Sequence, residues 1–114
     1  MKKEYILSKD RLQKLIDNPI TREEAIGRAL VRLFDRQIKL EKEKNTTFAS
    51  NKKGFTQPDA KAGSIHAKYF IRNGTLMQFQ VWYWAKIEKS GFSRLSKYWK
   101  QLNEVAEIKM GIRT

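Results

Sequence analysis

The segment NKKGFTQPDAKAG, at 51–63, has the residue types of a phosphate-binding loop. Lys52 and Lys53 supply positive charge, and the free backbone amides at the start of a following helix attract anions. The glycine-lysine-serine order of a Walker loop is missing. Phosphate contact by Lys52 and Lys53 is therefore one of two hypotheses for this segment.

The second hypothesis is that the segment only starts a helix. Gly54 permits a turn, the Thr56 side chain caps the first amides, and Asp59 at the third helical position completes a capping box. Pro58 suits the first turn, where amide groups lack partners within the helix. We favour this interpretation because it accounts for most residues of the segment.

Catalytic and metal-binding patterns are weak. His66 is the single histidine and there is no cysteine, so we expect a partly buried, hydrogen-bonded histidine rather than a metal ligand. Glu41, Glu43 and Asp59 carry the carboxylates that a small magnesium nuclease would use. EIK at 107–109 is like a fragment of a nuclease motif, yet these acids form no required spacing. We predict a nonenzymatic protein with no catalytic residue, metal or cofactor; a small magnesium nuclease is an alternative.

Basic residues follow a helical spacing in the first half of the chain. Steps of four, four and three residues place the following cations along one side of a helix: Arg28, Arg32, Arg36 and Lys39. Arginine binds phosphate bidentately, so such a ridge suits binding to a nucleic-acid backbone without sequence selection. The alternative is an ordinary solvated helix face.

A second group combines aromatic and basic residues near the C-terminus. Its members are Trp82, Trp84, Lys86, Lys89, Arg94, Lys97 and Lys100. Aromatic rings stack on unpaired bases, which is worth about 1–3 kcal/mol per base. Most aromatic residues must nevertheless fill the core of a small domain, so we expect one exposed tryptophan. Trp82 and Trp84 are the candidate partner-binding residues, and if the exposed one is Trp82 it would also serve as a hot spot for a protein partner.

Gln37 and Glu41 lie one helical turn apart and form a possible polar cluster. Their side chains would hold the loop at 45–57 through Thr47 or backbone amides. Recognition of a base or of a partner backbone is the functional alternative.

The apolar pattern predicts helices over most of the chain. A main helix at 22–44 follows Pro19, with Thr21 and Glu24 as a capping box. Ser8 caps a short helix over KDRLQKLIDN, and the helix after Asp59 continues through AKAGSIHAKYFIRN. A last helix lies within FSRLSKYWKQLNEVAEIKMG.

The segment at 75–89 fits two structures. Asn73 and Gly74 form a strong hairpin signal, and the residues after them alternate between apolar and polar. The same pair also ends one helix and allows another to begin. We favour helix, which predicts an all-α fold: one compact domain over 1–114 with four to five helices. An α+β fold with a hairpin around Asn73-Gly74 is the alternative.

Composition narrows the partners. The chain has 114 residues and a formal charge of +12, which favours an anionic partner, with nucleic acid ahead of a membrane surface or an acidic protein groove. The N-terminus lacks the apolar core of a signal peptide, and no segment is long and apolar enough to span a bilayer. The absence of cysteine fits a reducing compartment. We predict a cytoplasmic protein that does not bind membranes.

Scattered short motifs carry a resemblance. In chain order they are Arg28-Ala29-Leu30, Gln37, Glu41, Thr47, Gly54-Phe55, Asp59-Ala60, Ala67, Leu76, Gln80, Tyr83-Trp84 and Lys97-Tyr98-Trp99-x-Gln101-Leu102. Over about residues 28–102 the chain resembles a loose family of small phage and mobile-element proteins, also seen beside helicase-like and replication genes. The resemblance implies a helical module that works on DNA or with a DNA-processing enzyme.

The function expected from these observations is a nucleic-acid-binding accessory subunit. Its enzyme would be a phage or mobile-element polymerase, primase, helicase or recombination protein, with DNA favoured over RNA. The alternative is a phage-encoded inhibitor of a host nucleic-acid enzyme or defence system.

Overall fold

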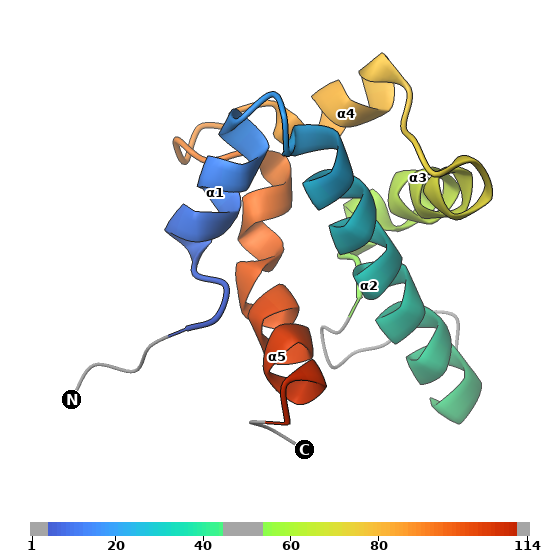
Figure 1. The fold of residues 1–114 in the computed structure, drawn as a ribbon. Coiled ribbons are helices and arrows are strands. Elements are labelled where there is room, and N and C mark those ends of the chain that lie inside the picture. Colours follow the sequence, from blue (N-terminus) through green and yellow to red (C-terminus); the bar gives the residue numbers. More distant parts are fainter. Residues whose placement is uncertain (1–4, 45–53, 112–114) are drawn as a thin grey trace.

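The described part of the chain folds into α-helices and two short 3₁₀ turns (Figure 1). The computed structural model describes residues 5–44 and 54–111. The helices are α1 (Lys9–Asp17), α2 (Arg22–Lys44), α3 (Ala60–Asn73), α4 (Gln78–Ala85) and α5 (Trp99–Lys109), with 3₁₀ turns η1 (Gln57–Asp59) and η2 (Arg94–Tyr98). Within the described residues there is no strand, only an isolated bridge between Ile87 and Ser93. The predicted all-α fold is confirmed.

Two helix starts show how local sequence sets the boundaries. The Ser8 hydroxyl accepts a hydrogen bond from the Arg11 amide at 3.1 Å, so the predicted cap of α1 is present. Helix α2 has its predicted bounds, but the Thr21 hydroxyl donates to the Leu15 carbonyl at 2.6 Å. Thr21 therefore ties the start of α2 to the end of α1.

The ambiguous segment after α3 is helical over eight residues. Gly74 adopts a φ of 74°, and its amide donates to the Phe70 carbonyl, which ends α3. Helix α4 then begins after Met77, whose amide donates to the Gln80 side chain at 2.9 Å. The preference for helix over a hairpin at Asn73-Gly74 is confirmed, although the chain leaves the helix at Lys86.

Helix α2 is central to the packing. It contacts α3 and α4 as well as α1 and α5, and in Figure 1 α5 lies between α1 and α2. The fully buried side chains include Leu12 and Ile16 of α1, Leu30 of α2 and Trp84 of α4. Helices α2 and α3 approach closely because Gly27 has no side chain: a Cβ there would lie 2.3 Å from the Phe70 ring.

Candidate functional site

A buried carboxylate organises the second half of the chain. Asp59, at the end of η1, is 0% exposed. Its Oδ2 accepts hydrogen bonds from the Tyr98 hydroxyl at 2.6 Å and from Lys97 Nζ at 2.8 Å. Its Oδ1 accepts from Arg94 Nη1 at 2.9 Å, and the same nitrogen donates to the Tyr83 hydroxyl at 2.8 Å. We call Asp59, Tyr83, Arg94, Lys97 and Tyr98 the Asp59 cluster.

The cluster stabilises the charged form of its carboxylate. Burial opposes ionisation of Asp59, but hydrogen bonds from Lys97 and Tyr98 and the positive charges of Lys97 and Arg94 outweigh it, so the pKa of Asp59 is lowered. Burial and the bond to Asp59 raise the pKa of Tyr98, so its hydroxyl remains a donor. The cluster thus joins η1, α4 and η2 through a single carboxylate.

The predicted capping box at 56–59 is wrong. Neither Thr56 nor Asp59 makes a side-chain capping bond, because both side chains turn toward η2 instead. The Thr56 hydroxyl lies 3.0 Å from the Tyr98 hydroxyl, which also accepts from the Thr56 amide at 3.1 Å. A tertiary contact has replaced the local one.

The loop before η1 is held by α5. The Gly54 amide donates to Gln101 Oε1 at 2.7 Å, and Gln101 Nε2 donates back to the Gly54 carbonyl at 3.0 Å. The Gly54 amide is therefore already hydrogen-bonded to Gln101, and the Thr56 amide is hydrogen-bonded to Tyr98. Neither amide is free to bind a phosphate. Lys52 and Lys53, predicted to contact phosphate, lie outside the described residues.

Of the polar cluster expected on α2, the structure describes the side chain of Gln37. Gln37 packs its Cβ against Gly54, and its side-chain amide lies 3.4 Å from the Ser64 hydroxyl. This supports a structural role for Gln37. Thr47 and the Glu41 side chain lie outside what the structure describes.

Arg36 does not belong to an exposed ridge. Its side chain is 13% exposed, with Nη1 donating to the Gln101 carbonyl at 3.1 Å and Nη2 paired with Glu104 at 2.9 Å. Helix α5 covers this position, which the spacing along α2 could not reveal. The prediction that Arg36 belongs to an exposed ridge and is free to bind phosphate is wrong.

The other three ridge residues differ in their exposure and in whether they form an ion pair. Arg28 pairs with Glu24 at 2.7 Å and Lys39 pairs with Asp35 at 3.2 Å, in both cases one turn apart on α2. Arg32 is half-buried and makes no ion pair within the described residues. The ridge is therefore interrupted and partly neutralised.

A stripe that the sequence analysis missed lies on α3. Lys61, Ile65, Lys68 and Arg72 are all exposed, and their steps of four, three and four residues place them on one helix face. No Asp or Glu occurs within α3, and none of the three cations forms an ion pair among the described residues. The stripe extends about 16 Å along the helix axis at 1.5 Å per residue. We call these four residues the α3 stripe.

One of the two candidate tryptophans, Trp84, lies in the core. Trp84 is 0% exposed, and its Nε1 donates to His66 Nδ1 at 3.0 Å, so Trp84 cannot contact a partner as predicted. Burial lowers the pKa of His66, which favours the neutral ring that accepts this bond. The expectation of a buried, hydrogen-bonded His66 is confirmed.

Trp82 is the exposed tryptophan that was expected, with 59% of its surface accessible. Lys86 Nζ lies 4.9 Å from its ring centroid, within cation–π range. Lys97 is bound to Asp59, whereas Lys100 is exposed and lies 5.9 Å from the Trp99 ring. Of the five cations predicted on this surface, Arg94 and Lys97 bind Asp59, while Lys86, Lys89 and Lys100 are exposed and form no ion pair among the described residues.

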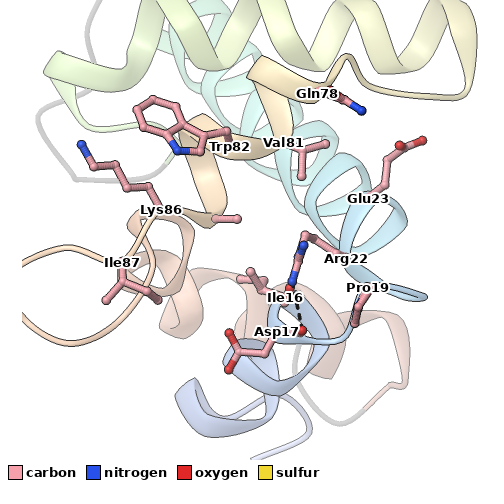
Figure 2. Close-up of a pocket in the computed structure, with 11 residues that line it drawn as sticks. Ile16, Asp17, Pro19, Arg22, Glu23, Gln78, Val81, Trp82, Lys86 and Ile87 are labelled. Atoms are coloured by element: carbon pink, nitrogen blue, oxygen red, sulfur yellow. Dashed lines mark hydrogen bonds between the residues drawn. The ribbon is translucent and has the colours of Figure 1, made fainter.

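Trp82 borders an open cleft of about 600 Å³ (Figure 2). One side comes from α4 and the residues after it, and the other from the end of α1 and the start of α2. The lining residues are Ile16, Asp17, Pro19, Arg22, Glu23, Gln78, Val81, Trp82, Ala85, Lys86 and Ile87. We call this the Trp82 cleft.

Comparisons with known proteins add no family to these observations. No protein-family model, curated protein or solved structure matches the chain. Among the described residues, no group of three or more His, Cys, Asp or Glu side chains could hold a metal ion. None of the described helices combines the length and apolarity needed to cross a membrane.

Proposed function

We propose that this protein is a nonenzymatic nucleic-acid-binding accessory subunit of a phage or mobile-element DNA-processing enzyme. The α3 stripe carries the proposal, because Lys61, Lys68 and Arg72 share one exposed face of a helix that has no acidic residue. A nucleic-acid strand presents phosphates at regular intervals, so a row of uncompensated cations binds it without reading bases.

The state of Asp59 supports a nonenzymatic role. A magnesium nuclease needs carboxylate oxygens that are free to bind a cation. Both Asp59 oxygens already accept hydrogen bonds, and the neighbouring Arg94 and Lys97 would repel a divalent ion. Asp59 therefore acts as a structural centre in this proposal.

A partner protein follows from the exposed Trp82 together with the resemblance to phage and mobile-element modules. Tryptophan is enriched among the residues that dominate binding energy at protein interfaces. In this arrangement the α3 stripe holds template or product while the Trp82 cleft attaches the subunit to its enzyme.

The test is binding of fluorescently labelled DNA, single- and double-stranded, to the double variant Lys61→Glu/Arg72→Glu. We expect affinity to fall by about tenfold or more for every sequence, and the slope of log affinity against log salt to become shallower by about 1.5–2. Far-ultraviolet circular dichroism verifies that the helices are retained.

The matched control is Lys14→Glu/Lys109→Glu, which reverses two exposed lysines outside α3 and changes net charge equally. It should weaken binding much less. An equal loss in both double variants would show that total charge, and not the α3 stripe, determines affinity, and would contradict the proposal.

A further inference from the structure

The exposed acidic residues of this basic protein are unevenly placed. Within the described residues, the exposed carboxylates without an ion pair are Asp10, Asp17 and Glu23. Two of the three, Asp17 and Glu23, line the Trp82 cleft. A chain with a charge of +12 therefore places free negative charge beside an apolar cleft.

The two cations of the cleft lining, Arg22 and Lys86, keep their charge, but each makes a contact within the protein. Arg22 Nε donates to the Ile16 carbonyl at 2.6 Å, and Arg22 Nη2 donates to the Asp17 carbonyl at 3.0 Å, as drawn in Figure 2. Lys86 lies over the Trp82 ring. The Asp17 carboxylate accepts one neutral hydrogen bond, from Gln13 at 2.8 Å, and Glu23 accepts none among the described residues.

The opposite side of the cleft is apolar. Trp82 and Ile87 are 59% and 51% exposed, and Ile16, Val81 and Ala85 also line the cleft. Figure 2 shows Trp82, Lys86 and Ile87 on one side of the cleft and Glu23 on the other, with Asp17 below them at the end of α1. An apolar surface of this kind, bordered by charge, is typical of a protein-binding site.

We propose that the Trp82 cleft binds a short segment of the partner protein in which an apolar side chain adjoins a lysine or arginine. The apolar side chain enters beside Trp82, and the cation approaches Glu23 and Asp17. This inference rests on the proposed function for the existence of a partner, and it adds the chemistry that the cleft selects.

The experiment is selection of random 12-residue peptides displayed on phage against the purified protein. A net charge of +12 alone favours acidic peptides. We expect instead a group of peptides in which a large apolar residue adjoins Lys or Arg, and which remains bound when unlabelled DNA is added. Selection of acidic peptides alone would overturn the proposal.

One selected peptide is then measured against matched variants. Trp82→Ala should weaken it by about 30-fold or more, the expected loss for a hot-spot residue. Phe79→Ala is the control, because Phe79 is 61% exposed on the same helix but does not line the cleft. Equal effects of the two substitutions would place the peptide elsewhere.

The charge contact is tested on α2. Glu23→Gln should weaken the peptide by about 2- to 5-fold, as expected for an exposed ion pair, while Glu24→Gln, in the same helical turn but paired with Arg28, should not. Glu23→Lys should weaken it further, and a peptide with its cation replaced by Glu should regain affinity for this variant. Failure of this exchange would contradict the assigned contact.

Two further outcomes separate this inference from the proposed function. Loss of DNA binding in the Lys61→Glu/Arg72→Glu variant with peptide binding retained would support separate surfaces. A Trp82-dependent dimer in sedimentation measurements would identify a second copy of this chain as the occupant and overturn the inference. The peptide result also stands alone if the protein binds no DNA.

Discussion

The Asp59 cluster and the α3 stripe use the same kinds of residue in opposite ways. In the cluster, Arg94 and Lys97 surround a carboxylate that is 0% exposed. On α3, Lys61 and Arg72 are exposed and no acidic residue lies on the helix. Cations that pair with a buried acid thus stabilise the fold. Exposed cations without an acidic neighbour on their helix are available to bind a partner.

The comparison also separates two electrostatic environments. The carboxylate of the Asp59 cluster is buried, and removing a partner from a buried ion pair is costly. Those of the α3 stripe are hydrated and screened by salt, so they contribute little to folding and respond to ionic strength. Substitutions in the two regions should therefore have different effects on stability and binding.

The largest expected effect is from Asp59→Ala. It leaves Arg94, Lys97 and the Tyr98 hydroxyl without their common acceptor, and we expect unfolding free energy to fall by about 3 kcal/mol. This free energy lies at the lower end of the range for breaking a buried ion pair, because Arg94 and Lys97 are 29% and 41% exposed. Urea denaturation followed by circular dichroism measures the change.

Asp35→Ala is the matched control, since it removes an acid from a pair whose side chains are 62% and 71% exposed. Its cost should be about 0.5 kcal/mol or less. Similar losses in the two variants would show that the Asp59 cluster has no special stabilising role.

The pKa of Asp59 predicts a related dependence on acid. Because this pKa is lowered in the folded state, its stabilising contribution is complete above the ordinary value of 3.8 and is lost as pH falls through the folded value. Stability measured between pH 5 and pH 2.5 should therefore decline less steeply in Asp59→Asn than in the original protein. Parallel curves would contradict the assignment.

The next effect concerns the loop that brings Asp59 to η2. Gly54 has a φ of +89°, and a Cβ there would lie 2.7 Å from Gln37 Cβ and 3.0 Å from Gln37 Cα. Gly54→Ala should lower stability by about 2–3 kcal/mol, because backbone strain and a clash with α2 add. Thermal unfolding measures it.

Gly74→Ala separates these causes. Gly74 also has a positive φ, of 74°, but a Cβ there would meet nothing within 4 Å. Its cost should be about 1 kcal/mol, from backbone conformation alone. A Gly54 variant no less stable than the Gly74 variant would remove the contact with Gln37 from the explanation.

The helices could be predicted from the sequence because their signals are local. Ser8 capping, the apolar stripe of α2 and the stop at Gly74 each depend on residues a few positions apart. The Asp59 cluster could not be predicted in this way. Thr56 and Asp59 have the spacing of a capping box, but their partners lie near 94–98, and the tertiary bonds replaced the local ones.

The candidate site shows the same limit and one oversight. Arg36 is not exposed because α5 covers it. The spacing of basic residues along α2 gives no information about that contact. The α3 stripe was accessible to sequence analysis, since Lys61, Lys68 and Arg72 follow helical spacing without acidic neighbours. A search for cations that lack nearby acids would have preferred α3 over α2.

Arg36→Ala tests a cation that the fold has engaged. It removes the contacts with the Gln101 carbonyl and Glu104, and should cost about 1–2 kcal/mol of unfolding free energy. Denaturant unfolding provides the measurement, and Arg32→Ala, which breaks no ion pair described on α2, is the control. A loss no greater than that of Arg32→Ala would show that the contacts of Arg36 with Gln101 and Glu104 do not stabilise the fold.

The smallest expected effect is from Arg28→Ala. Arg28 and Glu24 form an i,i+4 pair at 2.7 Å, but their side chains are 69% and 65% exposed. Water and salt screen such a pair, so unfolding free energy should change by about 0.3–0.5 kcal/mol at low salt and less at 1 M salt. Denaturation at two salt concentrations measures this, and the difference between Asp59→Ala and the original protein should persist in salt. If the Arg28 effect equalled that of Asp59 or did not respond to salt, the distinction between internal and surface cations would fail.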